Sequence, residues 1–327
     1  MNLSIKAAAF CIILLIIAGC SKAPEETRQE KAQDIQQEGM LKGVSLSPKS
    51  FQPDDFTDFF KKAGSMVSWA GDWNELRNDK GGPFVVTGLS KQNKYIPLIM
   101  LQFFTQSTGK LLKPMDEAKE GYKKSVVDFA GKYKPKYLGM GIEVNMLYEK
   151  SPAEFEEFVI FYNDAYDAVK AVSPDTKVFT IFQLEKMKGM NGGLFGGKND
   201  ASKAEWLLLE KFKSDIAAFT TYPGLIYKSP SEMPADYYAE IKQHTGKPIA
   251  FTEAGWHSAA SPKGWESSEA EQAEFAGIFI AAAKGLDAEF AVWSFLYDQS
   301  TIEPFNTMGF FTADGKAKES WAAWNSS

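Results

Sequence analysis

Cysteine and histidine are scarce in this chain, and their scarcity excludes several kinds of chemistry. Among 327 residues there are two cysteines, Cys11 and Cys20, and two histidines, His244 and His257. Both cysteines lie near the amino terminus, so the rest of the chain can form no disulfide, no thiolate metal site and no thiol nucleophile. Two histidines without cysteine partners do not make the usual ligand set of a zinc site. We therefore expect no metal and no cofactor, and a fold held by its hydrophobic core alone.

An excess of positive charge is also lacking. The chain has 36 Lys and Arg against 42 Asp and Glu, which gives a formal net charge of −6 and a pI near 5.3. No basic patch is expected, so nucleic acid is excluded as a partner. The Gly-rich segment 189–197 does not end in the Lys-Ser or Lys-Thr pair of a phosphate-binding loop. A lid and a plain linker are both open interpretations of that segment.

A single apolar run, residues 7–17, stands near the start of the chain and is too short to span a bilayer comfortably. Lys6 precedes it, and the small residues Ala18 and Gly19 lead to Cys20, an order typical of a secretory signal. The segment ending in Cys20 resembles the bacterial lipobox, in which signal peptidase cuts before the cysteine and the thiol receives a lipid. The resemblance implies a signal peptide over 1–19 and an extracytoplasmic lipoprotein, anchored through Cys20 at the cell surface or the periplasmic face. The alternative is an ordinary signal peptide that happens to contain this cysteine.

The segment that follows is poor in large apolar residues. Residues 21–39 are mostly Glu, Gln, Lys, Ala and Asp, with Ile35 as their one large apolar side chain. Such a composition buries too little surface to offset the entropy of ordering, so we predict a flexible tether over 20–40. No later shift in composition marks a second boundary, and we predict one domain over 41–327.

Apolar runs and amphipathic runs alternate within that domain. Predicted strands span residues 41–47, 65–69, 95–101, 137–143, 177–183, 215–222, 248–253 and 289–296. Predicted helices span residues 53–63, 115–133, 152–172, 202–212, 234–245, 268–285 and 317–324, and the crossover 73–94 has only a weak pattern. Buried strands that alternate with helices indicate a parallel sheet covered on both faces. About eight such units in a chain of this length predict an α/β fold, a single (β/α)₈ TIM barrel.

Two glutamates stand at the ends of predicted strands. Glu143 closes the strand 137–143, and Glu253 closes the strand 248–253. A carboxylate is costly to bury, so a glutamate in this position has either a structural partner or a chemical role. Because chemistry in a barrel collects at the carboxyl ends of the strands, we predict that Glu143 and Glu253 form a catalytic pair. The structural alternative is two buried carboxylates that are hydrogen-bonded to their neighbours.

The residues around both glutamates resemble a known family. Met140-Gly141-Ile142-Glu143-Val144-Asn145 is similar to the strand-four segment of clan A retaining glycoside hydrolases, and Phe251-Thr252-Glu253-Ala254-Gly255-Trp256 is similar to their strand-seven segment. Residues 215–223 resemble strand six of the endo-β-1,4-galactanase and β-1,3-glucanase-like branches. The resemblance implies that Glu143 is the acid/base and Glu253 the nucleophile, with the two carboxyl groups about 5 Å apart.

The resemblance also suggests substrate-binding residues and shows one departure. Tyr222 matches the tyrosine that orients the nucleophile, and Trp293 matches a sugar-stacking platform. Trp69 and Trp73 follow the second strand and could line a sugar subsite with their ring faces. Ile142 stands where the family has an asparagine that binds the sugar 2-hydroxyl, which implies a slower enzyme, a different sugar or no hydrolysis. Asn145 is a further substrate-binding candidate, although it lies beyond the strand end and cannot simply replace the missing amide.

Three classes of function remain open at this point. The first is a surface-anchored retaining glycoside hydrolase that acts on β-linked oligo- or polysaccharides as a monomer. The second is a catalytically weak or inactive barrel that binds glycans. The third, a solute-binding lipoprotein of a transporter, is disfavoured because two lobes with a hinge would interrupt the unit pattern at its midpoint. The Asp-x-x-Asp-x-Asp-x-Glu pattern of one chitinase type is absent.

Overall fold

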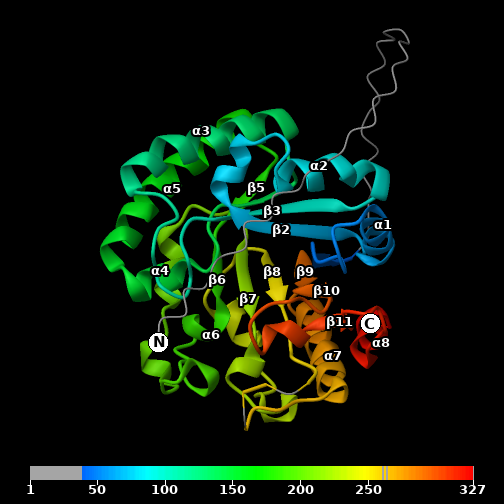
Figure 1. Ribbon diagram of the computed structural model, residues 1–327. Coiled ribbons are helices and arrows are strands. Elements are labelled where there is room, and N and C mark those ends of the chain that lie inside the picture. The colour runs from blue at the N-terminus through cyan, green and yellow to red at the C-terminus, as the bar shows by residue number, and fades with distance from the viewer. Residues whose placement is uncertain (1–38, 260, 263, 327) are drawn as a thin grey trace, which may run out of the picture. The chain divides into compact units, whose positions relative to one another are not determined.

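The computed structural model describes residues 39–259, 261–262 and 264–326 (Figure 1). The predicted signal peptide, the lipidation site Cys20 and almost all of the predicted tether lie outside these residues. The strands are β1 Leu41–Ser45, β2 Met66–Asp72, β3 Ile96–Gln102, β4 Tyr137–Gly139, β5 Lys177–Phe179, β6 Ile181–Gln183, β7 Ala217–Thr221, β8 Ile249–Ala254, β9 Phe290–Trp293, β10 Phe295–Tyr297 and β11 Gly309–Phe311. The α-helices are α1 Pro53–Lys62, α2 Gly82–Asn93, α3 Met115–Tyr133, α4 Val144–Lys150, α5 Pro152–Val172, α6 Leu184–Met187, α7 Glu269–Gly285 and α8 Glu319–Asn325.

Nine of the strands form one parallel sheet that nearly closes into a barrel. Its order is β5-β4-β3-β2-β1-β9-β8-β7-β6, so the two edge strands are β5 and β6. These two strands are halves of the single predicted strand 177–183, interrupted at Thr180. The amide of Ile181 still donates to Gly141 O, beyond β4, at 2.9 Å. One chain segment thus bridges both edges, and the predicted single (β/α)₈ barrel is confirmed.

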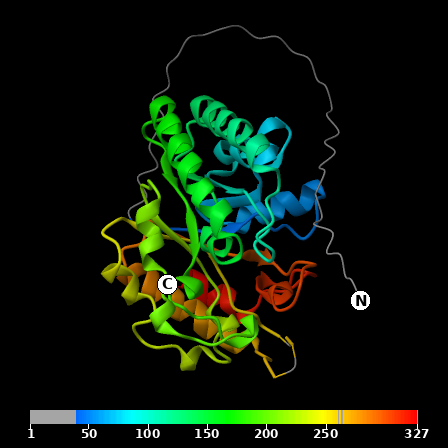
Figure 2. The same ribbon diagram turned by 90° about the vertical axis from the view of Figure 1, so that its left-hand side faces the viewer.

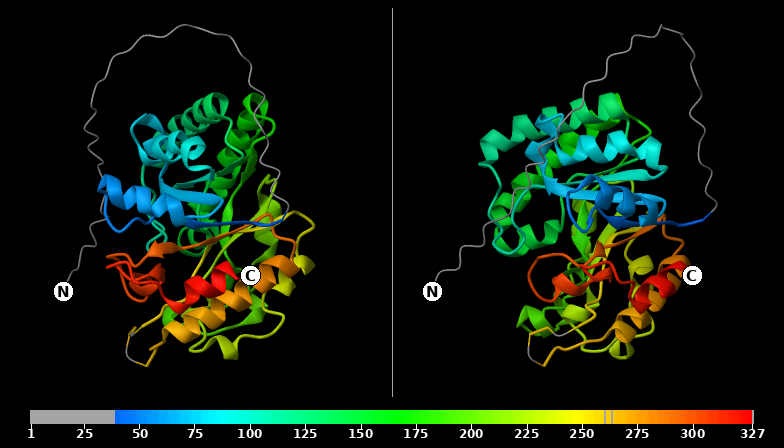
Figure 3. Two further views of the ribbon diagram at one scale, coloured as in Figure 1. Left: turned by 90° about the vertical axis from the view of Figure 1, so that its right-hand side faces the viewer. Right: turned by 45° about the vertical axis from the view of Figure 1, so that its right-hand side comes forward.

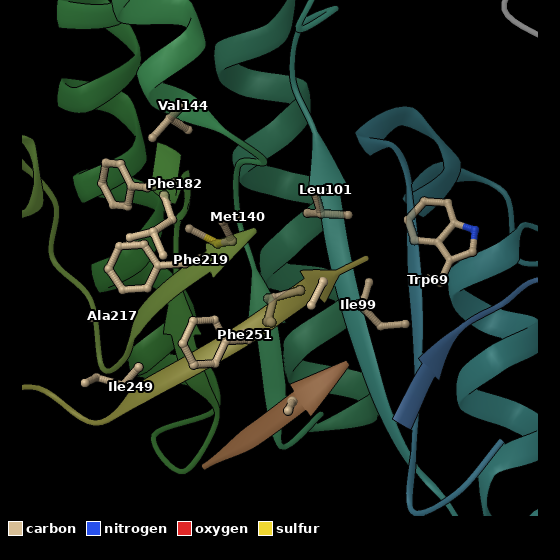
Figure 4. Packing of buried hydrophobic residues seen from close by; sticks show 14 of the residues in the cluster. Trp69, Ile99, Leu101, Met140, Val144, Phe182, Ala217, Phe219, Ile249 and Phe251 are labelled. Carbon is tan, nitrogen blue, oxygen red and sulfur yellow. The ribbon is translucent and has the colours of Figure 1, made fainter. Parts of the chain in front are cut away.

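Side chains alternate between the inside and the outside of this barrel. The barrel interior holds Leu41, Met66, Leu98, Met100, Tyr137, Ile142, Phe179, Ile181, Ile216, Ala218, Ala250, Phe290 and Val292. The residues between them on the strands belong to the larger core cluster outside the barrel. Figure 4 draws Ile99 and Leu101 on β3, and Phe219 and Phe251 on β7 and β8, among the members of this cluster. The period of two along each strand therefore decides which side chains can reach the mouth of the barrel.

Two pairs of helices cover flanks of the barrel. α3 and α5 lie side by side over one flank (Figure 2), and α7 packs along α8 on another (Figure 3). Between α3, α5 and the end of β3, Phe103 packs against Tyr122, Phe158 and Phe161, with ring centroids 4.8–5.7 Å apart. This aromatic layer fixes the two longest helices against the strands that carry the site.

Two predicted helices are wrong. The segment 202–212 forms the 3₁₀ turns Ala201–Lys203 and Trp206–Lys211, and the segment 234–245 keeps only the 3₁₀ helix Ala239–Gln243. In the first segment Trp206 and Leu208 are buried while Leu207 between them is 76% exposed, a spacing that no face of an α-helix provides. Tertiary packing thus overrode a local apolar pattern. The short helix α4, directly after Glu143, was not predicted.

No helix among the described residues is long and apolar enough to cross a membrane.

Candidate active site

Three inward positions on neighbouring strands form a row at the carboxyl end of the barrel. Gln183 on β6 pairs in register with Thr220 on β7, and Thr220 pairs with Glu253 on β8. Side chains at paired positions of adjacent strands lie on the same face and are neighbours. Gln183, Thr220 and Glu253 therefore form one layer, which we call the mouth row.

Glu253 reaches the mouth row because of an irregularity in β8. The pairing of β8 with β7 shifts between Phe219 and Thr220, so that Thr252 is an extra residue. Without this bulge the alternation from the inward Ala250 would turn Glu253 toward the helices. The Thr252 hydroxyl donates to Phe219 O at 3.2 Å. A bulge of this kind re-aims a side chain, and here it turns the carboxylate into the mouth.

Glu143 reaches the same place by an unusual backbone path. Gly141 has φ +137°, and a Cβ there would lie 2.9 Å from both Phe158 Cζ and Val144 Cγ1, so only glycine fits. Glu143 itself is left-handed, with φ 52° and ψ 46°, and directly precedes the first turn of α4. Non-glycine residues in this conformation are strained and cluster at functional sites. This left-handed conformation turns the chain from β4 into α4 and leaves the Glu143 side chain at the mouth.

The Glu143 carboxyl group is held by one neutral donor. Thr220 Oγ1 donates to Glu143 Oε1 at 2.7 Å. Burial and then the negative charge of Glu253 raise the pKa of Glu143 to about 7, and the Thr220 hydrogen bond opposes this shift. Because Thr220 also pairs with Glu253 across β7 and β8, both carboxyl groups lie beside Thr220 at the mouth.

Glu253 accepts a hydrogen bond from a phenol. Tyr222 OH donates to Glu253 Oε2 at 2.6 Å, and the same phenol oxygen lies 2.8 Å from Ser294 Oγ. Burial raises the pKa of Glu253, and the hydrogen bond from Tyr222 works in the opposite direction. Burial and the charge of Glu253 raise the pKa of Tyr222, so its proton stays available to the carboxylate. Two carboxyl groups in different surroundings can carry different protonation states at one pH.

A third carboxyl group supports the pair from outside the barrel. Glu185, which is fully buried at the start of α6, accepts three hydrogen bonds on Oε1, from Thr221 Oγ1, Tyr222 N and Tyr237 OH, each at 2.9 Å. The bond from Tyr222 N fixes the backbone of the residue that binds Glu253. Burial raises the pKa of Glu185. Sequence reasoning gave no role to Glu185, which lies in α6 just after β6, or to Thr220, near the end of β7.

Asn145 has a structural task instead of the predicted contact with substrate. Its Nδ2 donates to Gln183 O at 3.0 Å, and its Oδ1 accepts from Gln183 N at 2.9 Å. Both ends of the amide are thereby used, and the side chain is buried. Asn145 ties α4 to β6 through these two bonds.

The three tryptophans predicted to bind sugar lie in the outer core. Trp293 faces α7 and α8, where its ring stacks on Phe310 at 4.7 Å and its Nε1 donates to Met308 O. Trp69 packs against the α2 backbone at Gly82, and Trp73 is buried against α3. The strand ends were located correctly, but alternation turns Trp69 and Trp293 outward (Figure 4 shows Trp69). The residue beside Tyr222 is Ser294, which directly follows β9.

Other aromatic rings are partly exposed around Tyr222. Phe305 lies edge-on to Tyr222 at 5.1 Å, and Phe195 and Phe295 belong to the same small cluster. Phe195 comes from the Gly-rich segment 189–197, whose composition gave no sign of this position. Ile142 is 6% exposed and fills the barrel interior below the mouth row.

No cluster of His, Cys, Asp and Glu among residues 39–259, 261–262 and 264–326 could hold a metal ion. His244 stacks on Trp206, and His257 Nε2 lies 2.8 Å from Trp265 O. Neither histidine belongs to the mouth row.

No family model matches the chain, and no curated protein matches it. Solved structures match it in fold. A variant of a subfamily 18 family 5 glycoside hydrolase from Streptomyces cattleya, in complex with Manβ1-4GlcNAc, is 14% identical with a TM-score of 0.62, over 87% of this chain and 79% of that one. A family 39 glycoside hydrolase from the gut symbiont Bacteroides cellulosilyticus WH2 is 16% identical with a TM-score of 0.57.

A psychrophilic family 10 endo-β-1,4-xylanase is 12% identical with a TM-score of 0.55, over 88% of this chain and 96% of that one. The match to the family 39 enzyme covers 88% of this chain but only 63% of the length of that enzyme. At this level of identity the comparisons show a shared barrel fold.

Proposed function

We propose that this chain is a retaining glycoside hydrolase that cleaves β-linked oligo- or polysaccharides, anchored to a membrane outside the cytoplasm through a lipid on Cys20. The observation that carries the proposal is the pair of buried carboxyl groups at the barrel mouth, each with its own hydrogen-bond donor. Burial and the charge of Glu253 raise the pKa of Glu143 to about 7, and Thr220 donates a hydrogen bond to it, while Glu253 accepts a hydrogen bond from the Tyr222 phenol. The fold similarity to glycoside hydrolases supports it.

The proposed reaction has two displacement steps. In the first step Glu253 attacks the anomeric carbon, the glycosidic C–O bond breaks, and Glu143 gives its proton to the leaving oxygen. In the second step Glu143 takes a proton from water, and the water oxygen attacks the anomeric carbon. The ester bond to Glu253 then breaks and restores its carboxylate. Tyr222 stabilises that carboxylate through its hydrogen bond and is a positioning residue.

Variants of the two glutamates test the roles separately. We expect Glu143→Ala to slow substrates with poor leaving groups by about 10²- to 10⁴-fold while it spares activated aryl β-glycosides, since only the former need the proton. Glu253→Ala should abolish turnover of both. The measurement is kcat/KM across aryl glycosides of graded leaving-group pKa. Equal losses in the two variants at every leaving group would contradict the assignment.

A glycan-binding barrel without turnover is the second candidate function, and Ile142 is the observation that favours it. This side chain fills the barrel interior and offers no hydrogen bond to a sugar hydroxyl. The wild type is tested for hydrolysis of a broad panel of β-glycosides and for binding of oligosaccharides. Binding without hydrolysis would mean that the protein is a glycan-binding barrel and not an enzyme.

A further inference from the structure

Gln183 carries a buried polar group to which no other described residue forms a hydrogen bond. Its side chain is 5% exposed, and Oε1 is buried without a hydrogen-bond partner among the described residues. Buried polar side-chain atoms in native proteins nearly always have a partner, and an exception calls for an explanation. Leaving such an atom unpaired lowers stability, so a residue of this kind is retained for some other reason.

The alternation along the strand aims this amide at the mouth. Ile181 lies in the barrel interior and Phe182 in the outer core, so Gln183 returns to the inner face. There it stands in the mouth row beside Thr220, the residue that donates to Glu143. Only Thr220 separates Gln183 from Glu253 along the row.

The backbone that carries the amide is fixed. Asn145 binds both the N–H and the C=O of Gln183, at 2.9 and 3.0 Å. Asn145 is the second residue of α4 and lies two residues after Glu143, so the positions of Gln183 and Glu143 are linked. A side chain on such a support presents its amide at a defined place relative to the carboxyl pair.

The chemistry of the site favours a hydroxyl group as the partner. A primary amide donates and accepts hydrogen bonds without charge, and a sugar hydroxyl does the same. An anionic group would meet the carboxyl groups of Glu143 and Glu253 and would be repelled. We propose that Gln183 binds a hydroxyl of the sugar residue held between Glu143 and Glu253. This inference rests on the proposed function and assigns it one specific substrate contact.

Gln183→Met tests the contact, because methionine has a similar length and forms no strong hydrogen bond. We expect kcat/KM on 4-nitrophenyl β-glycosides to fall about ten- to a hundredfold. We also expect Tm to stay the same or rise, since the substitution removes an unpaired buried atom. Unchanged kcat/KM would overturn the proposal, and so would a loss of Tm that accounts for the lost activity.

Gln272 provides a matched control for stability. It is fully buried, whereas Gln183 is 5% exposed. Its Nε2 donates to Trp256 O at 2.8 Å and its Oε1 accepts from Ser320 Oγ at 2.7 Å. Gln272→Met should therefore lower Tm by several degrees. A similar drop in both variants would mean that Gln183 has structural partners, which contradicts the proposal.

Deoxy substrates identify the hydroxyl. The wild type and Gln183→Met are compared on the 2-, 3-, 4- and 6-deoxy analogues of the best 4-nitrophenyl glycoside. For the hydroxyl that Gln183 binds, the rates of the two proteins should converge, as the contact is already lost. A constant ratio across all analogues would show that Gln183 acts on the site without touching a hydroxyl.

The design separates this inference from the proposed function. If the wild type hydrolyses no glycoside, the proposed function fails, and calorimetric binding of β-linked trisaccharides of glucose, galactose, xylose and mannose decides the role of Gln183. A Kd at least tenfold weaker in Gln183→Met supports the contact. Equal Kd values, or no binding by the wild type, overturn it.

Discussion

Ionising Glu143 is unfavourable in the folded chain. Burial and the neighbouring charge of Glu253 raise its pKa from 4.5 to about 7, against the single hydrogen bond from Thr220. In the unfolded chain neither influence remains, so the carboxyl group returns to its ordinary pKa. Between pH 4.5 and 7 the folded state therefore binds more protons than the unfolded state, and Glu143 lowers stability as the pH rises through this range.

Glu143→Gln should remove this pH dependence. Glutamine keeps the shape of the side chain and cannot ionise. We expect the free energy of unfolding of the variant to exceed that of the wild type by on the order of 2–3 kcal/mol above pH 7, with the difference disappearing toward pH 4. Urea unfolding at a series of pH values measures it. A difference that does not change with pH would show that the charge of Glu143 is not the cause.

At the scale of elements, the corner between β6 and α6 holds both carboxyl groups in place. Gln183 at the end of β6 is bound by Asn145, which follows Glu143, and Glu185 at the start of α6 binds the backbone of Tyr222. Glu253 lies on β8 and Glu143 follows β4. The corner between β6 and α6 binds Asn145, next but one to Glu143, and the backbone of Tyr222, which binds Glu253. Their relative position thus depends on a segment that contributes neither of them.

Asn145→Ala should disturb catalysis more than stability alone explains. We expect a cost of about 1–3 kcal/mol from the unpaired backbone groups of Gln183, together with a kcat/KM reduced at least tenfold on aryl β-glycosides. Asn163 on α5 is the matched control, because its amide binds Lys211 O and Lys213 N in the same two-way manner in the helix layer. Asn163→Ala should cost stability and leave kcat/KM within about threefold. Equal kinetic effects in the two variants would refute a special role for Asn145.

The apolar runs and the strand ends could be predicted from the sequence. Whether a given side chain points into the barrel or toward the helices could not. The runs that end in Glu143 and Glu253 are buried strands because burial on both faces requires apolar residues throughout. The bulge at Thr252 depends on pairing with β7, which no local pattern encodes. For the same reason the prediction for Trp293 was wrong. This residue lies at the end of its strand as expected, but its side chain points out of the barrel instead of into the mouth. Glu185 has no local signal, since its partners Tyr222 and Tyr237 come from later in the chain.

At the scale of the whole molecule, the first strand of the described domain contacts its last barrel strand and its last helix. β1 pairs with both β2 and β9, so the first strand lies between the second and the last strand of the barrel. Lys42 Nζ on β1 also donates to Trp324 O on α8 at 2.8 Å, which links the start of the domain to its final helix. Because its two ends are joined by strand pairing and by this contact, we expect the domain to fold without residues 1–38 and to need them only for location.

Cys20→Ser tests the proposed location. If the thiol of Cys20 carries the lipid, the variant should leave the membrane fraction or remain unprocessed, because serine cannot be lipidated in this way. Cys11→Ser is the control, since Cys11 lies within the predicted signal peptide and its loss should leave the protein in the membrane fraction. Cell fractionation with immunoblotting measures both. Any released Cys20→Ser protein should keep the wild-type Tm, as the barrel makes its own core. A Cys20→Ser protein that is processed to the mature size and still stays in the membrane fraction would show that another part of the chain is the anchor.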